Sequence, residues 1–343
     1  MRASGTHHVV RERATSPTSG AYVSSTDHQL FGWWGEGQVG QNALVSENSL
    51  KEWWTYRRYR RLTDDEWRQT LLDSVSGSSK LPMPGFPPEQ LQRSYVGQAG
   101  ADTIEEGWRF YSLMAERWKK HGLRLGFRSH VMDFGCGWGR FGRMFLHDVP
   151  GSNIWLVDTL NQALDVCRET GVPGHRVRVE PMPPSSLPSN QFDLVFAFSV
   201  FSHLSPMAHL AWRTELSRSM KPGGLAFITT QARWFLDECV RYREHPELQS
   251  HKWHEKLANS FRDYDAAVAA YDRGEFLFAS DKRQWDGAVS ADMPPELAPD
   301  YYGEAVVPAA YFEAKWKEAG FELLEFVADR ARCEQAVAIL RRV

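Results

Sequence analysis

The sequence of 343 residues has few cysteines and no long apolar run, and both absences narrow the classes of protein to consider. Its four cysteines, Cys136, Cys167, Cys239 and Cys333, lack the C-x-x-C spacing of zinc ribbons and the density of a disulfide framework. No run reaches the roughly 18 apolar residues that a membrane-spanning helix needs, and the first residues lack the apolar core of a signal peptide. We therefore expect free thiols, no membrane partner and a cytoplasmic location.

The chain also lacks an excess of either charge. Its 40 Lys and Arg against 43 Asp and Glu give a formal net charge of -3. Since proteins that bind nucleic acids normally present a basic field, the composition does not favour a nucleic-acid partner. One local exception is YRRYRR at 56–61, where basic and aromatic residues alternate. This segment fits either a grip on RNA or the solvated face of a helix.

What is present is material for a large core. Apolar residues make up 42% of the chain and aromatic residues 13%, with 14 tryptophans. This composition is typical of globular proteins, and the length exceeds that at which a single core stops growing. We expect one large domain with appended segments, or two smaller domains.

Composition shifts divide the chain into four parts. Residues 1–45 are rich in Ser, Thr, Gly and charge without periodicity, which predicts a disordered leader. Residues 46–123 show apolar steps of three and four, interrupted by prolines, which predicts a helical lid segment with a long helix over 103–121. Residues 231–304 are polar and charged, and we expect them to form a helical cap inserted into a core made of 124–230 and 305–343.

Short apolar runs alternate with helical patterns through the predicted core. The runs lie at 130–134, 153–158, 176–180, 192–200 and 224–230, and the helical patterns between them at 141–147, 161–170 and 206–220. This alternation predicts a parallel sheet covered by helices on both faces. A helix at 308–320 and two closely connected strands at 321–329 and 334–342 complete it. The predicted fold is a three-layer α/β sandwich whose seven-stranded sheet is mostly parallel, with an antiparallel last strand.

The end of the first run carries two overlapping glycine patterns. Gly137-x-Gly139-x-x-Gly142 matches the dinucleotide fingerprint of NAD and FAD enzymes. Asp133-x-Gly135-x-Gly137-x-Gly139 places an acid and three alternating glycines after an apolar strand. The dinucleotide pattern starts at Gly137, two residues later than Gly135, the first glycine after the strand. The charge of Asp133 would repel a pyrophosphate but attract an ammonium group.

Several segments, in chain order, resemble the class I S-adenosylmethionine-dependent methyltransferase family. They are DFGCGWG from Asp133, WLVD ending in Asp158, FDLVFAFSVFSHL from Phe192, and MKPGGLAFITT from Met220. The resemblance covers 124–230 and 305–343 and implies a Rossmann-like methyltransferase fold, S-adenosyl-L-methionine as cofactor and methyl transfer to an acceptor. An NAD-dependent oxidoreductase is the alternative that the pattern Gly137-x-Gly139-x-x-Gly142 leaves open.

The resemblance also implies a set of cofactor-binding residues. The glycine turn would lie under the methionine portion, with Asp133 acting on its ammonium through water or backbone, and Asp158 would accept the ribose hydroxyls. The family often has an acid after strand three that receives the adenine amino group, but this chain reads EPMPPSS, so packing by Met182 is expected instead. The cofactor-binding candidates are Asp133, Gly135, Cys136, Gly137, Asp158, Thr159, Met182 and Phe198.

His203 is the candidate for catalysis. A histidine just after the fourth strand lies at the sheet edge where open α/β folds bind ligands, and its ordinary pKa suits a general base. The competing interpretation is a packing residue. Tyr95 and Trp138 are predicted to border the pocket. His251 and His254 have a spacing that allows a shared metal, but no carboxylate joins them, so no metal is predicted.

The cap favours a small-molecule acceptor, such as a sugar or specialised metabolite methylated on oxygen or nitrogen. A protein or RNA methyltransferase and a catalytically inactive binding module stay open as alternatives. The sequence allows a homodimer and does not decide the oligomeric state.

Overall fold

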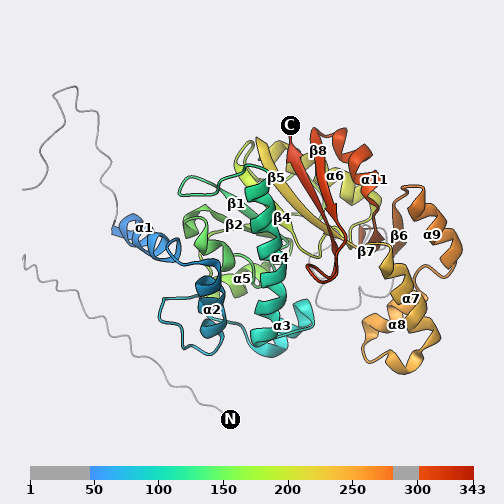
Figure 1. Cartoon of the computed structure of the whole chain (residues 1–343), viewed down its shortest axis with the longest axis horizontal. Helices are drawn as coiled ribbons and strands as arrows, with labels where there is room; N and C mark the ends of the chain where they lie inside the picture. The colour runs from blue at the N-terminus through green and yellow to red at the C-terminus, as the bar shows by residue number, and fades with distance from the viewer. Residues whose placement is uncertain (1–46, 281–300) are drawn as a thin grey trace, which may run out of the picture. The chain divides into compact units, whose positions relative to one another are not determined.

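The computed structural model describes residues 47–280 and 301–343 (Figure 1). The predicted leader at 1–45 and the part of the predicted cap at 281–300 lie outside the described residues. Within the described part, no helix has the length and apolar character needed to cross a membrane.

The centre of the fold is a seven-stranded sheet in the order β3-β2-β1-β4-β5-β9-β8. Every pairing is parallel except those of β9, which runs antiparallel to both β5 and β8. The predicted sandwich with a reversed last strand is therefore confirmed. The strands are β1 (Val131–Phe134), β2 (Ile154–Asp158), β3 (His175–Arg178), β4 (Phe192–Ala197), β5 (Met220–Thr230), β8 (Phe321–Val327) and β9 (Ala336–Arg342).

Alternate side chains of the strands build two separate cores. Val131 and Leu194 belong to the core on one face of the sheet, whereas their neighbours Met132 and Val195 belong to the core on the other. This two-residue alternation is why the strands read as continuous apolar runs, since both faces are covered. The first core is closed by α2 (Asp64–Val75), α4 (Gly100–Lys120) and α5 (Asn161–Glu169). The second is closed by α6 (Pro206–Ser219), α11 (Ala309–Tyr311) and the π-helical turn η4 (Phe312–Trp316).

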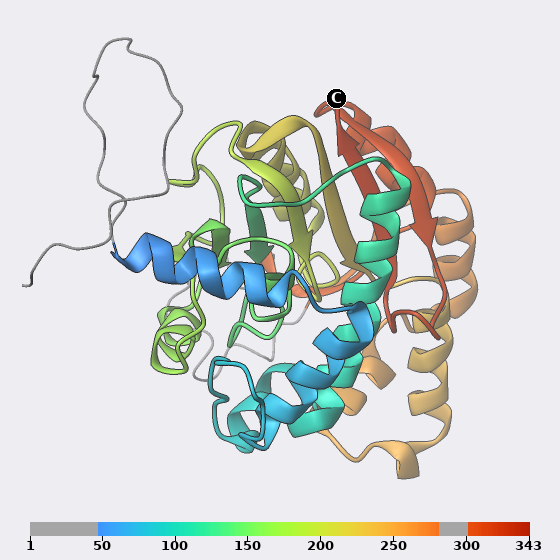
Figure 2. The ribbon, with the colours of Figure 1, turned by 60° about the vertical axis from the view of Figure 1, so that its left-hand side comes forward.

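The segment before the sheet is helical, as predicted. Figure 2 shows α1 (Glu47–Tyr59) joined at an angle to α2, which lies beside α4. The long helix α4 begins at Gly100 rather than at Thr103, because the Gln92 side chain accepts the Gly100 amide at 2.9 Å and supplies the missing helix cap. A short helix, α3 (Glu89–Val96), follows the proline-rich stretch.

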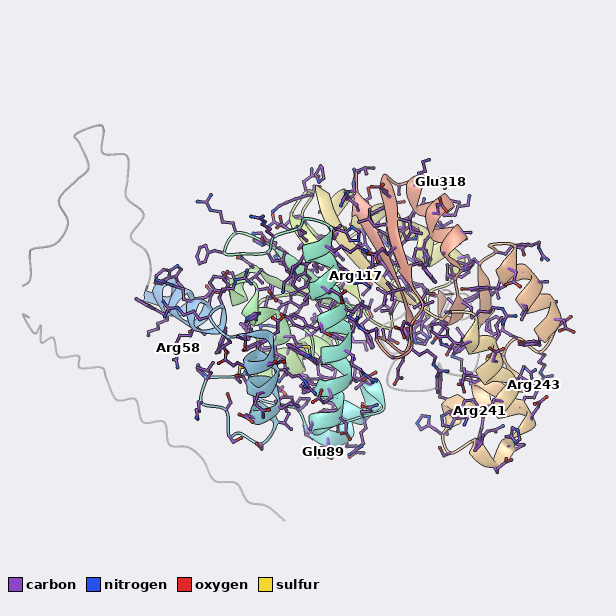
Figure 3. All side chains as sticks on the ribbon, viewed as in Figure 1. Arg58, Glu89, Arg117, Arg241, Arg243 and Glu318 are labelled. Atoms are coloured by element: carbon purple, nitrogen blue, oxygen red, sulfur yellow. The ribbon has the colours of Figure 1, made fainter. Side chains whose placement is uncertain are left out.

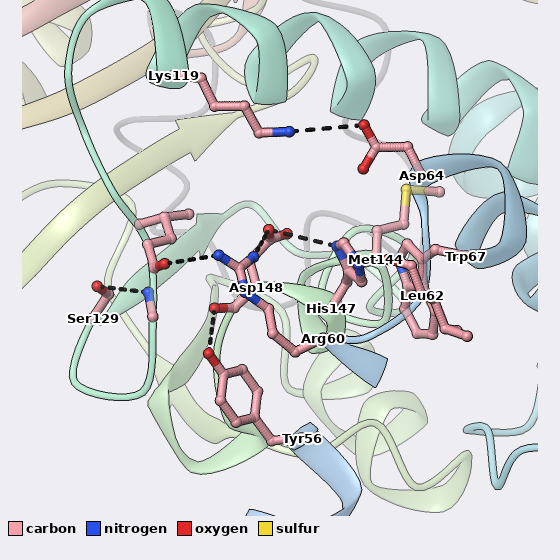
Figure 4. A network of polar contacts seen from close by, with 12 residues as sticks. Tyr56, Arg60, Leu62, Asp64, Trp67, Lys119, Ser129, Met144, His147 and Asp148 are labelled. Atoms are coloured by element: carbon pink, nitrogen blue, oxygen red, sulfur yellow. Dashed lines mark hydrogen bonds and ion pairs between the residues drawn. The ribbon is translucent and has the colours of Figure 1, made fainter. Parts of the chain in front are cut away.

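Asp148, in the buried segment between β1 and β2, bonds to α4 and to residues at the end of α1 (Figure 4). Its carboxylate accepts the Tyr111 hydroxyl at 2.5 Å and pairs with Arg60 at 3.3 Å, and its backbone carbonyl accepts the Tyr56 hydroxyl at 3.4 Å. Two members of the basic and aromatic segment at 56–61 therefore pack against the protein, which favours a structural role for that part of the segment.

The helix predicted over 141–147 is wrong. Residues 137–143 form successive turns, followed only by the short 3-10 helices η1 (Met144–His147) and η2 (Gly151–Asn153). All residues from 138 to 151 are buried, so this segment has no solvent-facing side for an amphipathic α-helix to present.

The insertion after β5 has a small core of its own. Its helices are α7 (Trp234–Glu244), η3 (Pro246–Leu248), α8 (Lys252–Asn259) and α9 (Tyr264–Asp272). Arg243 on α7 donates to the carbonyls of Ala258 and Ser260 at 2.9 and 2.8 Å and so fixes the end of α8 (Figure 3). The insertion is not purely helical as expected: β6 (Leu277–Ser280) and β7 (Gly303–Val306) pair antiparallel in a separate sheet.

The buried His209 on α6 makes the fold sensitive to acid. Its Nε2 accepts the Trp316 indole at 2.9 Å, and burial lowers its pKa to about 3. An unfolded histidine binds a proton near pH 6.5, so this contribution to stability is present above that pH and is lost as pH falls toward 3. At pH 5 the loss amounts to about 2 kcal/mol.

We predict that His209→Gln flattens the dependence of the unfolding free energy on pH between 7 and 5, because glutamine still accepts the indole but does not titrate. Urea denaturation at both pH values measures this. The exposed His245→Gln is the control and should keep the wild-type slope. An unchanged slope in His209→Gln would contradict the assignment.

Candidate functional site

The main cavity opens at the carboxyl ends of β1, β2 and β4, where the strand order reverses direction. Open α/β sheets bind ligands at this position. The cavity measures about 290 Å³. Its lining comes from the sheet, α3 and the segment before β7, and consists of Tyr95, Val96, Phe134, Gly135, Cys136, Gly137, Trp138, Arg140, Phe141, Val157, Asp158, Thr159, Leu160, Val179, Phe198, Ser199, Val200, His203, Leu204, Tyr301 and Tyr302.

The floor of the cavity is bare backbone at the end of β1. Gly135 has φ +79°, and a Cβ there would lie 2.3 Å from Cγ2 of Val200. The amides of Gly135 and Cys136 donate to the carbonyl of Val157 at 2.8 and 3.1 Å. A side chain at position 135 is therefore excluded both by conformation and by space, and the turn is held to β2 by its own backbone.

Gly142 serves packing. A Cβ at this glycine would lie 2.7 Å from Cδ2 of Leu156, so its absence lets the turn approach β2. A dinucleotide site needs a helix N-terminus behind the glycines to receive the pyrophosphate, and the 3-10 helix η1 has only four residues. The geometry thus gives the NAD pattern no physical support.

Asp158, at the end of β2, is fixed toward the same turn. One carboxylate oxygen accepts the Gly137 amide at 2.9 Å and the other accepts the Leu160 amide at 3.0 Å. Burial raises the pKa of this carboxyl group, while the backbone donors of Leu160, Gly137 and Thr159 oppose that shift. The carboxylate therefore has one defined orientation on the cavity wall.

Asp133 is not among the residues that line the cavity, and its expected action on the ammonium through water or backbone stays a prediction. It is 1% exposed within β1, and its Oδ2 has no hydrogen-bond partner. Burial, followed by the charge of Asp158, raises its pKa well above the usual range, although Arg140 and the Gly142 amide act in the other direction. Burial therefore opposes the charged form of Asp133, on which the electrostatic argument against a pyrophosphate depends.

Arg140 is a cavity residue that the sequence analysis missed. It is 3% exposed and pairs with Glu106 on α4 at 2.7 Å. Its guanidinium carbon lies 4.7 and 5.0 Å from the ring centroids of Phe141 and Phe198. Its Nη2 is buried without a partner. An arginine inside an otherwise apolar glycine turn is the signal that could have identified it, because a buried cation needs an anion.

His203 lies in the loop after β4. Its Nδ1 is 2.9 Å from the carbonyl of Gly303, and its ring stacks on Tyr302 with centroids 5.0 Å apart and planes at 14°. Since the carbonyl only accepts, Nδ1 carries the proton in the neutral ring, which leaves the lone pair on Nε2. Nε2 is 3.4 Å from the Ser199 hydroxyl, which also lines the cavity.

Most of the other predicted site residues meet in this cavity. Cys136, Gly137, Thr159 and Phe198 line it, as do Tyr95 from α3 and Trp138. Met182 does not: it packs against the core on the α6 side, and the residue from this region that lines the cavity is Val179. The loop after β3 turns away because Pro181 is held by the Trp212 indole at 2.9 Å.

His251 and His254 lie in the insertion. His254 stacks on Tyr242 with ring centroids 4.3 Å apart. Among residues 47–280 and 301–343, no group of three or more His, Cys, Asp or Glu side chains is arranged to hold a metal ion.

A family model described as a methyltransferase domain matches residues 132–226, from β1 into β5. The chain is also similar to solved S-adenosylmethionine-dependent methyltransferases. One from Mesorhizobium loti has 14% identity over 66% of this chain and 96% of that chain, with a TM-score of 0.40. One from Leishmania major has 13% identity over 84% and 85%, with a TM-score of 0.44. No curated protein matches the sequence.

The buried Asp133 generates a prediction about stability. Its unfolded pKa is near 3.9, so its raised pKa in the folded chain contributes stability below that pH, which is lost as pH rises toward the folded value. We predict that Asp133→Asn raises the unfolding free energy at pH 7 by about 1–3 kcal/mol, because it removes the cost of burying an ionisable group.

Chemical denaturation at pH 7 and pH 4 measures the effect, which should shrink at the lower pH. Asp165→Asn on the exposed side of α5 is the matched control and should change neither value. A destabilised Asp133→Asn at pH 7 would contradict the interpretation.

Proposed function

We propose that this chain, of which residues 132–226 match a methyltransferase domain, is a class I S-adenosylmethionine-dependent enzyme that methylates an oxygen or nitrogen of a small acceptor, such as a sugar or specialised metabolite. The observation that carries the proposal is that a fixed carboxylate, Asp158, and a histidine whose Nε2 keeps its lone pair, His203, line one cavity beside a bare glycine turn.

The residues of the cavity fit S-adenosyl-L-methionine. Asp158 presents a carboxylate suited to the ribose hydroxyls, while Thr159, Leu160 and Val179 offer apolar surface for the adenine. The unpartnered Nη2 of Arg140 fits the carboxylate of the methionine portion, since guanidinium and carboxylate groups pair strongly. The cofactor supplies an electrophilic methyl group on a sulfonium sulfur.

The remaining wall supports a small acceptor of low charge. Besides Arg140 and Asp158, the lining residues are mostly apolar or aromatic, among them Leu204 and Tyr301. His203 would act as the general base: Nε2 takes the proton from a hydroxyl or ammonium group of the acceptor, while Nδ1 keeps its hydrogen bond to Gly303. Proximity and alignment within the cavity supply the rest of the acceleration.

The assignment of Arg140 can be tested with two ligands that differ only in the amino-acid portion. We predict that Arg140→Met weakens S-adenosylhomocysteine binding about 10- to 100-fold, because one charge-assisted hydrogen bond of about 1.5–3 kcal/mol is lost. Binding of 5′-methylthioadenosine, which has no carboxylate, should change little. Calorimetry measures both.

Arg109→Met, which removes an exposed arginine of α4, is the control and should bind both ligands as the wild type does. Equal weakening of both ligands in Arg140→Met would show that the arginine shapes the pocket rather than binding the carboxylate.

The proposed reaction is tested by incubating the full chain and methyl-labelled S-adenosylmethionine with a panel of small hydroxyl and amino compounds. We expect a labelled product one methyl heavier than its acceptor by mass spectrometry. His203→Ala should lose at least about tenfold in turnover while keeping its affinity for S-adenosylhomocysteine. Label found in RNA or protein, with none in small molecules, would overturn the acceptor class.

A further inference from the structure

A buried carboxylate lies directly behind the histidine of the cavity. Glu304, in β7, is 0% exposed. Its Oε1 accepts the Trp253 indole at 3.1 Å and the Lys256 ammonium at 2.9 Å, both from α8. Among the residues that the structure describes, its Oε2 has no hydrogen-bond partner, and it lies 3.5 Å from Nδ1 of His203. The two oxygens thus face two different elements: one faces the insertion and the other faces the cavity histidine.

This arrangement is more than a structural ion pair requires. A buried carboxylate is stable when it is paired and hydrogen-bonded, and Lys256 and Trp253 provide this for Oε1. Leaving Oε2 buried and unpartnered costs free energy, so its place beside an imidazole calls for an explanation. A ring that gains a proton during turnover would supply the missing partner.

Three consecutive residues hold the ring. Tyr302 stacks on its face, the Gly303 carbonyl accepts a hydrogen bond from Nδ1, and Glu304 places a carboxylate oxygen near the same nitrogen. Nδ1 is therefore held by residues of β7, whereas Nε2 contacts the Ser199 hydroxyl, which lines the cavity. The core provides the histidine, and the insertion provides the groups that orient it.

We propose that Glu304 is a positioning residue that holds His203 in the Nδ1–H tautomer and stabilises the imidazolium formed during methyl transfer. This inference rests on the proposed function. The bond between the acceptor atom and the methyl carbon forms as the bond from that carbon to sulfur breaks, and its electron pair stays on sulfur. The acceptor proton passes to Nε2, and the positive charge of the sulfonium is replaced by that of the imidazolium.

In the described part of the chain, Lys256 on α8 and Cys239 on α7 are the charged and titratable groups that act on Glu304. Lys256 shares the Glu304 carboxylate and opposes a positive charge on His203. Burial, with a smaller contribution from Glu304, raises the pKa of the Cys239 thiol to about 12, so the cysteine is neutral at physiological pH. Glu304 pairs with the His203 ring at 3.5 Å.

The test measures the tautomer and the titration of His203 in the full chain. Both are monitored by long-range proton–nitrogen NMR on ¹⁵N-histidine-labelled protein. The chain has 12 histidines, and His203→Asn identifies the signal that belongs to position 203. We expect the neutral ring to show the Nδ1–H pattern. In Glu304→Gln the midpoint of the titration should move down by about one pH unit.

Two further variants separate this role from a structural one. Glu304→Asp, which keeps the charge, should keep the midpoint of the His203 titration close to that of the wild type. Lys256→Met removes the competing cation and should move the midpoint up, opposite to Glu304→Gln. A structural role alone does not predict opposite shifts.

An Nε2–H tautomer in the wild type, or a midpoint unmoved in Glu304→Gln, overturns the proposal. The tautomer is measured on the unmodified chain, so a variant that fails to fold leaves the test intact. Calorimetry with S-adenosylhomocysteine on the same sample tests the proposed function separately, because cofactor binding does not depend on the tautomer of His203.

Discussion

The structure depends on one constraint: the chain leaving β1 must pass the ends of β2 and β4 without a side chain. Gly135 lies against Val200, where a Cβ would come within 2.3 Å of a methyl group. The carboxylate of Asp158 then fixes the following amide, at Gly137, and so couples the turn to β2. A larger residue at position 135 would displace the loop that carries His203, so the turn sets the positions of Asp158 and His203 on the cavity wall together.

Around this turn, the core and the appended segments make different contributions. The sheet supplies Asp158 and the bare backbone, and α4 supplies Glu106, which holds Arg140 in the cavity. The segments outside the sheet supply part of the cavity lining, with Tyr95 from α3 and Tyr302 before β7.

The sequence predicts the sheet well because alternating burial leaves a direct trace in apolar runs, and the glycine turn and Asp158 follow from local motifs. The helix expected over 141–147 does not form because its residues are buried on all sides. The roles of Arg140 and Glu304 could not be predicted because their contacts join residues that are distant in sequence. For example, the Gly303 carbonyl, which orients His203, is 100 residues away from that histidine. Met182 shows the opposite failure, since a position inferred by family resemblance turns toward the core.

The account is tested most directly by calorimetric titration of the unmodified full chain with S-adenosylhomocysteine and, in parallel, with NAD. It predicts one S-adenosylhomocysteine per chain and no heat of binding with NAD, because the turn is followed by no α-helix that could receive a pyrophosphate. Binding of NAD without binding of S-adenosylhomocysteine would contradict it.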